Sequence, residues 1–359
     1  MTRESGATDE GDAGHGWSRH DLAVDTGDGR LDDTDPTAET PLVTAVVTTY
    51  DRFEEATRAI ESVLAQTYEP VEFIVVEDGT ESGIEVWLTE QGHYSVRYVR
   101  HATNQGLAGA RNTAIALASG DYVAFLDDDD SWKPERIERQ VSALRSLSDG
   151  ERENLGVVYC AVEAREDGRV TSVIPPENSG NLREAIARDG PSTLQSACLF
   201  SKRALLAVDG YDEELVSSVD HDIWLSLAVG GYSAVTVAEP LVVSYDTFAD
   251  SMMTNTDERI EGVAQFVEKW RPTYVDWFGR EEADRRLQRY FARVIARLAA
   301  TKLVSGSFGE ARRAIAVLFE RSDQTSYNVA TLALLTAEAA VKRFVPPALV
   351  RRLAAIRNR

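Results

Sequence analysis

Four consecutive aspartates, Asp127–Asp130, directly follow an apolar run, and their type and spacing suit the binding of a cation. Side chains at alternate positions of an extended chain point to the same face, so Asp127 and Asp129 can converge while Asp128 points away. Paired carboxylates are suitable ligands for Mg²⁺ or Mn²⁺, with water and substrate phosphates in the remaining positions. The alternatives are a solvated acidic run or a charge patch at a helix start. We expect a Mg²⁺ or Mn²⁺ site that neutralises a diphosphate leaving group.

Two further polar clusters follow short apolar runs, namely TTYDR at Thr48–Arg52 and EDGT at Glu77–Thr80. In an open α/β sheet, ligands bind outside the carboxyl ends of the strands. The three clusters are therefore expected on one edge of one sheet. There, Asp78 can accept hydrogen bonds from a nucleobase or ribose, and Thr48 and Tyr50 offer a hydroxyl and a ring to the same ligand.

A glycine-rich segment, NQGLAGARN at Asn104–Asn112, places Gly106 and Gly109 at a predicted helix start and Arg111 one turn further on. Free N–H groups and a guanidinium at such a position favour a phosphate. No G-x-G-x-x-G follows the first predicted strand, and the chain has no G-x-x-x-x-G-K-[ST]. These absences exclude the usual dinucleotide-binding fold and the P-loop NTPases.

The elements that carry these clusters alternate between short apolar strands and amphipathic helices. Strands are predicted at 43–48, 71–76, 96–100 and 121–126, with helices at 52–66, 107–118 and after Pro134. This alternation predicts an α/β fold with a mostly parallel sheet flanked by helices. A further helix is expected at 222–229. Beyond residue 254 the periodicity is helical, which predicts a C-terminal helical region.

The distribution of charge divides the chain into the same parts. Residues 1–40 carry a net charge of −8 and few large apolar residues, which predicts a disordered acidic tail. Residues 41–254 carry −20, and residues 255–359 carry +7, within a total of −21. So acidic a surface binds nucleic acid poorly. It also suits a protein that works in high salt, so we expect a salt-adapted source.

The two cysteines, Cys160 and Cys198, lack the spacing of a zinc or redox motif and are expected to be buried thiols. The N-terminus has no apolar core typical of a signal peptide. The longest weakly polar stretch, Val329–Val341, is shorter than the ~20 apolar residues that a membrane span needs. We therefore expect a cytoplasmic protein.

In order and spacing, the motifs resemble those of the family 2 glycosyltransferases, which have the GT-A fold. The resemblance rests on VTAVVTTYDR, FIVVEDGT, GLAGARNTAI and YVAFLDDDDSWKPERI, and then on SSVDHDIWLSLAVGG at Ser217–Gly231. It covers about residues 41–250, so the predicted domains are an acidic tail at 1–40, a GT-A domain at 41–254 and a basic helical region at 255–359.

The resemblance implies roles for individual residues. Asp129 would hold the metal, with Asp127 as its partner by spacing, and Asp220 would be the general base. The alternative for Asp220 is a solvated residue that caps the following helix. The family's Glu-Asp pair is Val219-Asp220 here, so only the aspartate is kept. The predicted nucleotide-sugar ligands are Thr48, Tyr50, Asp78, Gly106, Arg111, Asp127 and Asp128.

One position departs from the family's pattern. Many family members carry a histidine after the last strand that reaches the metal or the diphosphate. Here the corresponding stretch is Ser244–Ser251, with Phe248 in place of the histidine. Either the metal has fewer protein ligands, or a neighbour such as Asp246 replaces the histidine.

The resemblance implies an inverting, metal-dependent enzyme of the hexosyltransferase type. It would move a sugar from a UDP-sugar to a hydroxyl of a glycan or lipid-linked oligosaccharide, the latter on a dolichol-type lipid if the source is a salt-adapted archaeon. A polyprenyl (dolichyl) phosphate sugar synthase is the alternative. A catalytically inactive GT-A binding module is a third reading, which the retained aspartates disfavour.

The last twenty residues, 340–359, contain six basic residues and no acidic one, interleaved with large apolar residues. This pattern is typical of a helix on an anionic membrane surface. Ordinary packing against the acidic domain is the alternative. The hypothesis is peripheral attachment to the cytoplasmic face of the membrane, close to a lipid-linked acceptor.

Overall fold

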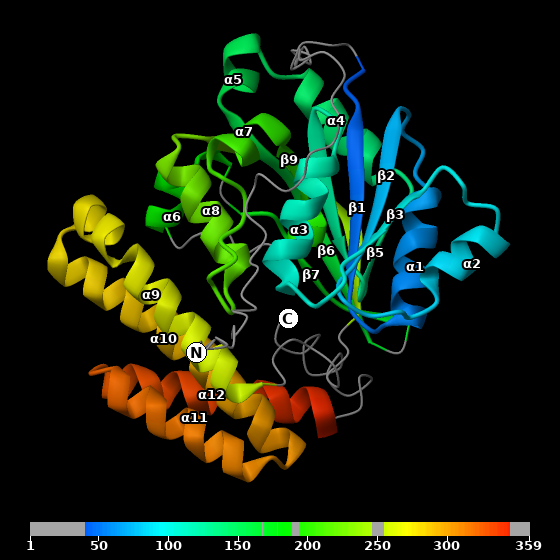
Figure 1. Ribbon diagram of the computed structural model, residues 1–359. Helices are drawn as coiled ribbons and strands as arrows, with labels where there is room; N and C mark the ends of the chain where they lie inside the picture. Colours follow the sequence, from blue (N-terminus) through cyan, green and yellow to red (C-terminus); the bar gives the residue numbers. More distant parts are fainter. Residues whose placement is uncertain (1–39, 167, 178, 189–193, 246–254, 345–359) are drawn as a thin grey trace, which may run out of the picture. The chain divides into compact units, whose positions relative to one another are not determined.

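The computed structural model describes residues 40–166, 168–177, 179–188, 194–245 and 255–344 (Figure 1). The predicted acidic tail at 1–40 lies almost wholly outside these residues. So do Asp246, Phe248 and the last fifteen residues of the basic end.

Strands and helices alternate through the first part of the chain, and four long helices follow. The elements are β1 (Val43–Thr49), α1 (Phe53–Leu64), β2 (Val71–Glu77), α2 (Ile84–Glu90), β3 (Arg97–Arg100), α3 (Gly106–Leu117), β4 (Tyr122–Asp127), β5 (Asp130–Trp132), α4 (Arg136–Arg145), α5 (Asp149–Glu153), β6 (Leu155–Glu166), β7 (Arg169–Ile174), β8 (Gly180–Asn181), α6 (Leu182–Arg188), the 3₁₀ turn η1 (Gln195–Ala197), β9 (Cys198–Ser201), α7 (Lys202–Ala207), α8 (Val219–Val229), β10 (Ser233–Tyr245), α9 (Thr256–Phe278), α10 (Arg280–Ser305), α11 (Phe308–Arg321) and α12 (Thr325–Phe344).

The strands form one mixed sheet in the order β3-β2-β1-β4-β9-β6-β10-β5, with β7 beside β6 and β8 beside β10. β1 pairs in parallel with both β2 and β4. Its register sets Thr48 opposite Asp127 and Thr49 opposite Glu77. The carboxyl ends of β1, β2 and β4 therefore meet at one edge, as predicted.

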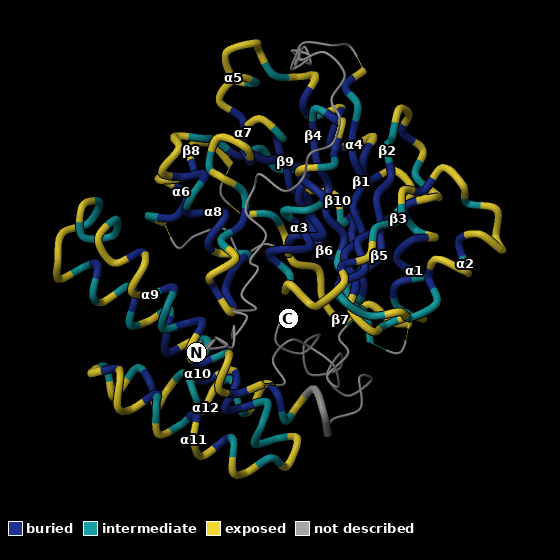
Figure 2. The backbone as a smooth tube through the Cα atoms, in the orientation of Figure 1, coloured by how far each residue is buried: buried dark blue, intermediate teal, exposed yellow. Residues whose placement is uncertain are grey.

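Two apolar cores cover the two faces of the sheet. All seven residues of β1 are buried, as expected for a strand that is covered on both sides (Figure 2). One core joins the sheet to α1, α2 and α4. The other joins it to α3, α6, α7, α8 and the second half of α9, from Phe266 onward. The α/β fold class, with a mostly parallel sheet flanked by helices, is confirmed.

The C-terminal helical region is also confirmed, and it has a core of its own. Apolar residues of α9, α10, α11 and α12 pack together, with α10 in contact with each of the other three. Among the described residues, no helix combines the length and apolar character needed to cross a bilayer.

Three local features differ from the expectation. The sequence pattern predicts that Asp130 does no more than lead into the helix after Pro134, but Asp130 lies in the short strand β5 and is buried. The pattern at 196–200 predicts a strand, but this segment begins as a 3₁₀ turn. The helix expected at 222–229 begins at Val219, so Asp220 lies in its first turn. The strand β5 pairs with β10, which is more than 100 residues away, so no local pattern reveals it. Cys160 and Cys198 are buried thiols, as predicted.

Candidate active site

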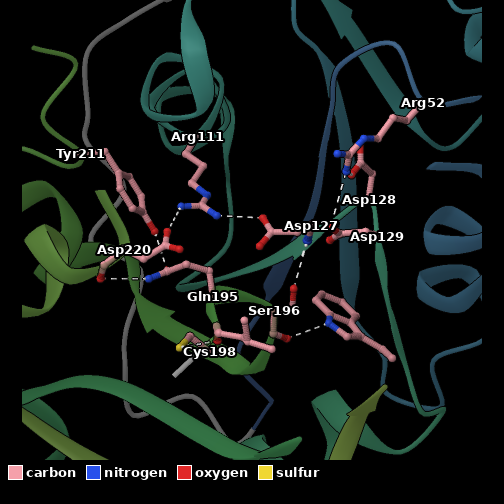
Figure 3. Close-up of polar contacts among 12 residues, drawn as sticks. Arg52, Arg111, Asp127, Asp128, Asp129, Gln195, Ser196, Cys198, Tyr211 and Asp220 are labelled. Atoms are coloured by element: carbon pink, nitrogen blue, oxygen red, sulfur yellow. Dashed lines mark hydrogen bonds and ion pairs between the residues drawn. The ribbon is translucent and has the colours of Figure 1, made fainter. Parts of the chain in front are cut away.

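The ends of β1 and β4 are joined by Asp128. The Thr49 hydroxyl donates to Oδ2 of Asp128 at 2.8 Å, and Nη1 of Arg52 donates to Oδ1 at 3.0 Å. The same nitrogen of Arg52 lies 3.5 Å from Oδ2 of Asp129 (Figure 3). Asp128 is buried and is held by the last residue of β1 and by Arg52, which follows that strand. Its predicted contact with the nucleotide sugar stays a prediction.

Arg111 lies at the centre of the site with no exposed surface. Its Nη2 donates to Oδ1 of Asp127 at 2.8 Å, and its Nη1 donates to Oδ1 of Asp220 at 2.5 Å (Figure 3). The guanidinium carbon also lies 5.2 Å from the ring centre of Tyr211 and 5.8 Å from that of Phe125. The two carboxylates offset the cost of burying this guanidinium. Arg111 therefore connects the end of β4 to the start of α8.

This pairing affects how the site titrates. Burial by itself lowers the pKa of Arg111, but the ion pairs with Asp220 and Asp127 raise it above its ordinary value. The cation is thus a fixed positive charge in the site. Both of its terminal nitrogens are engaged by carboxylates, so a direct contact of Arg111 with a phosphate remains a prediction.

The acidic run crowds like charges together. Burial raises the pKa of Asp127 to about 6 against the opposing effect of Arg111, and Asp220 and Asp129 add to the rise. Burial, followed by the charges of Asp129 and Asp127, raises the pKa of Asp130 to about 8. Closely spaced carboxylates resist simultaneous ionisation unless a cation is present. The electrostatics of the site therefore suit a bound divalent cation.

The donor set fits a cation that protein and substrate hold together. Asp129, at the mouth of the site, keeps 34% of its side chain exposed. Within the described ranges, no cluster of three or more His, Cys, Asp or Glu could hold a metal ion. Mg²⁺ does not need such a cluster, because it is commonly bound by one or two carboxylates together with substrate phosphates. Asp129 and Asp127 would supply such carboxylates, and their role as ligands stays a prediction. The replacement ligand considered at Asp246 lies outside the described residues.

Asp78 follows β2 at the same edge of the sheet and is almost fully buried. Its Oδ1 accepts hydrogen bonds from Nδ1 of His101 and from the backbone N–H of Gln105, both at 2.8 Å. Nε2 of His101 lies 2.9 Å from the hydroxyl of Thr113. Both of these hydrogen bonds end on Oδ1 of Asp78, so Oδ2 is the oxygen that the predicted contact with the nucleoside would use. His101 is a supporting residue that the sequence reasoning missed, because no local motif marks it.

The loop after β2 has a backbone that only glycine accommodates. Gly79 has a φ of 82°, and a Cβ added there would lie 2.2 Å from the backbone nitrogen of Asn104. The buried carboxylate of Glu77 fastens the loop further, because it accepts hydrogen bonds from the N–H of Ser82 and the hydroxyl of Thr80. The position of Asp78 is therefore fixed by its neighbours on both sides.

The remaining predicted ligands lie at the same edge. Tyr50 is 51% exposed, as a ring available to a ligand should be. Thr48 is buried, and its hydroxyl has no hydrogen-bond partner among the described residues. Gly106 is the first residue of α3, and its N–H donates to Oδ1 of Asn104 at 2.9 Å. The roles of these three residues stay predictions.

Asp220 enters the site from the other side, on the first turn of α8, with 37% of its side chain exposed. Nε2 of Gln195 donates to its backbone carbonyl at 3.4 Å. The Tyr211 hydroxyl donates to Oε1 of Gln195 at 2.9 Å. Asp220 is thus ion-paired within the site rather than a freely solvated residue at a helix start. Gln195 was missed from the sequence, since nothing in its local sequence distinguishes it.

The sheet, its flanking helices and the carboxylates at its carboxyl edge define a GT-A glycosyltransferase architecture. The solved structure of Staphylococcus aureus TarS 1–349 in complex with UDP-GlcNAc shares this fold. It superposes with a TM-score of 0.54 at 14% identity, over 85% of this chain and 93% of that chain.

Sequence comparison identifies the family of the domain. Residues 44–192 match the model of the family described as glycosyl transferase family 2. The chain is 28% identical over 203 residues to the amylovoran biosynthesis glycosyltransferase AmsB of Erwinia amylovora, covering 55% of this chain and 67% of that protein. It is 26% identical over 250 residues to the putative colanic acid biosynthesis glycosyl transferase WcaA of Escherichia coli K12, covering 65% and 83%. The protein is a glycosyltransferase with a family 2 domain. Asp220 lies outside the matched residues.

Proposed function

We propose that the protein is an inverting, metal-dependent glycosyltransferase that moves a sugar from a UDP-sugar to a hydroxyl of a glycan or lipid-linked oligosaccharide. One observation carries the proposal. A single buried guanidinium, that of Arg111, pairs with Asp127 on the cation side and with Asp220 on the opposite side. The side chain of Arg111 thereby holds both the proposed base, Asp220, and a proposed ligand of the cation, Asp127. The reacting sugar and the diphosphate would lie between these two carboxylates.

In the proposed reaction, Asp220 accepts the proton of the acceptor hydroxyl as that oxygen attacks the anomeric carbon. The bond between this carbon and the diphosphate oxygen breaks, and its electron pair leaves with the nucleoside diphosphate. Attack opposite to the leaving group inverts the anomeric configuration. The ion pair with Arg111 uses Oδ1 of Asp220, so Oδ2 is the oxygen that receives the proton.

Asp129 and Asp127 would hold the divalent cation, which when bound neutralises charge that develops on the leaving diphosphate. Asp78, Thr48 and Tyr50 would bind the nucleoside at the neighbouring strand ends. Arg111 keeps Asp220 and Asp127 in place and supplies a fixed positive charge between them. The proposal that the donor is a UDP-sugar rests on the family resemblance of the motifs at Thr48–Arg52 and Glu77–Thr80, which would contact the nucleoside.

A glycan acceptor is supported by the relatives, which are named for amylovoran and colanic acid biosynthesis. The second candidate function is a polyprenyl (dolichyl) phosphate sugar synthase, whose acceptor is a phosphate rather than a hydroxyl. A general base is dispensable for a phosphate acceptor, so the ion-paired Asp220 favours the hydroxyl. An inactive GT-A binding module would bind the donor without turnover.

The test is a panel of nucleotide sugars, with Mg²⁺ or Mn²⁺ and at high salt, scored for binding and for slow release of the free nucleotide. A UDP-sugar should bind and be hydrolysed, because water can replace the missing acceptor. Binding without turnover would favour the inactive module. If no nucleotide sugar binds, the proposed function is wrong.

We also propose a cytoplasmic location, with peripheral contact to an anionic membrane through residues 340–359, and a salt-adapted, archaeal source. The first is supported by the basic, apolar-interleaved sequence of that segment, of which residues 345–359 lie outside the described structure. The second is supported by the net charge of −21.

A further inference from the structure

The first turn of α8 lies between the reacting site and the C-terminal helix α9. Asp220 points toward Arg111, whereas Ser217, three residues before it, and Asp222, two residues after it, contact α9. Residues two apart on a helix face roughly opposite directions, so one side of the turn can serve the site while the other packs on a support. α9 lies entirely outside residues 44–192, which match the family model.

Asp222 provides the polar part of this contact. Its side chain is buried, and its Oδ1 accepts a hydrogen bond from Nε1 of Trp270 at 2.8 Å. Nζ of Lys269 lies 2.7 Å from the same oxygen and 2.7 Å from Oδ2 of Asp212. Two successive residues of α9 therefore hold one carboxylate of α8. A buried carboxylate held by a charged and a neutral donor allows little displacement of the turn.

Ser217 provides the close backbone contact. A Cβ added to Gly262 of α9 would lie 2.2 Å from the hydroxyl oxygen of Ser217 and 2.5 Å from its backbone nitrogen. One residue earlier, the N–H of Val216 donates to Oε1 of Gln265, which also lies on α9, at 3.2 Å. The absence of a side chain at Gly262 is therefore what lets α9 approach the segment that leads into α8.

The residue next to Asp220 is enclosed by aromatic rings. The His221 ring centre lies 6.3 Å from that of Phe266 on α9 and 5.2 Å from that of Tyr290 on α10. Ser218, which begins the turn, has a left-handed φ of 68° without being glycine. Such a backbone conformation is unfavourable by itself and persists only where its surroundings enforce it.

We propose that α9 positions the general base, with Gly262, Trp270 and Asp222 as positioning residues that fix the first turn of α8 and hence the carboxylate of Asp220. The inference rests on the proposed role of Asp220. A misplacement of a reacting group by about 1 Å can cost on the order of 100-fold in rate. The helical region is then part of the catalytic apparatus rather than an appended module.

Two variants of the full chain test the proposal, with a matched control. Gly262→Ala forces α9 away from Ser217, and Trp270→Phe removes the donor to Asp222 while keeping a ring. Gly309→Ala, on α11, places the same methyl group where no atom lies within 4 Å. The measurements are the dissociation constant of UDP with Mn²⁺ and the rate of UDP release from the UDP-sugar that the wild type hydrolyses.

Gly262→Ala and Trp270→Phe should lower the rate of UDP release by about 10- to 100-fold. Their affinity for UDP should stay within about twofold of the wild type, and Gly309→Ala should match the wild type in both measurements. A fall in UDP affinity parallel to the fall in rate would indicate a general loss of folded protein and would overturn the proposal. So would an unchanged rate in both variants.

A double-mutant cycle with Asp220→Asn separates a positioning role from a structural one. If α9 acts through Asp220, adding Gly262→Ala or Trp270→Phe to Asp220→Asn should reduce the rate no further. Additive losses would overturn the inference while leaving the proposed function intact. An undiminished rate in Asp220→Asn alone would instead remove the base from the proposed function, and this inference with it.

Discussion

At the scale of the residue, Arg111 links two carboxylates that lie 16 and 109 positions away in the chain. It fixes one oxygen of Asp220 and one of Asp127, so each carboxylate has a defined orientation before any ligand binds. Groups that need no reorganisation contribute most to catalysis. Mutations of the two carboxylates should nevertheless have different effects, because Asp127 would bind the cation and Asp220 would accept the proton of the acceptor hydroxyl.

The first prediction concerns Asp220. Asp220→Asn keeps the shape of the side chain but removes its capacity to accept a proton. The rate of UDP release should fall by about 10²- to 10⁴-fold, while UDP should bind with an affinity near that of the wild type. Glu338→Gln, at an exposed carboxylate of α12, is the control and should change neither. Loss of UDP binding in Asp220→Asn would place this residue in the donor site instead.

The second prediction concerns Asp129 and the cation. Removing divalent ions with a chelator should weaken UDP binding by about tenfold or more in the wild type, because the diphosphate loses its counter-charge. In Asp129→Ala, binding should be weak with or without Mn²⁺. Titration calorimetry of UDP measures both. Glu54→Ala, at an exposed carboxylate of α1, should keep the response of the wild type. An Asp129→Ala variant that still responds to Mn²⁺ would contradict the assignment.

At the scale of the element, the site depends on loops whose backbone is set by neighbouring segments. The loop after β2 passes so close to Asn104 that Gly79 has no space for a side chain. The segment before α8 passes equally close to Gly262 of α9. In both cases a strand or helix carries a site residue at its end, and a second element fixes that end.

The third prediction compares two glycines with left-handed backbones. Gly92→Ala, with a φ of 74° and no crowding, should cost about 1 kcal/mol of unfolding free energy from its backbone alone. Gly79→Ala adds a clash with the backbone and should cost about 2–4 kcal/mol. Urea unfolding measures both values. Only Gly79→Ala should also weaken UDP binding, because Asp78 would move. Equal effects of the two changes would argue against a fixed loop.

Much of the site at element scale follows from local pattern. Four strands and the helices between them can be recognised in the sequence. Each strand is a short apolar run, and each helix is long enough to show the spacing of its apolar face. The polar residues of Thr48–Arg52, Glu77–Thr80 and Asp127–Asp130 follow those strands directly. Strand β5 is different, because its three residues are stabilised by pairing with β10. From the local pattern Asp130 only leads into the helix after Pro134, whereas in the structure it is buried in this strand.

At the scale of the whole molecule, the net charge of −21 has consequences for stability. Like charges on a compact surface repel one another, and salt screens this repulsion within a Debye length of about 10 Å at 0.1 M. The fourth prediction is that the thermal unfolding midpoint rises as KCl increases from 0.1 M to 2 M. Calorimetry or circular dichroism measures it. A midpoint that stays constant or falls would contradict a salt-adapted protein.

The fifth prediction concerns the basic end. Removal of residues 340–359 takes away six positive charges and should reduce binding to vesicles that contain anionic phospholipid, each charge near the surface being worth about 1 kcal/mol. Co-sedimentation with vesicles measures this, and vesicles of neutral phospholipid are the control. Unchanged binding after truncation would exclude this segment as the membrane contact. UDP binding should be unaffected.

The sequence by itself determined the class of the protein and the edge of the sheet where its site lies. Buried strands need apolar runs and their ends need polar residues, so both leave a local signature around Asp78 and Asp127–Asp129. Only the tertiary structure decided that Arg111 joins Asp127 to Asp220 and that α9 supports the turn that carries Asp220. The contacts of Arg111 with Asp220 and of Trp270 with Asp222 join residues 109 and 48 positions apart. Their partners are chosen by packing and by the need to neutralise buried charge, which no local periodicity encodes.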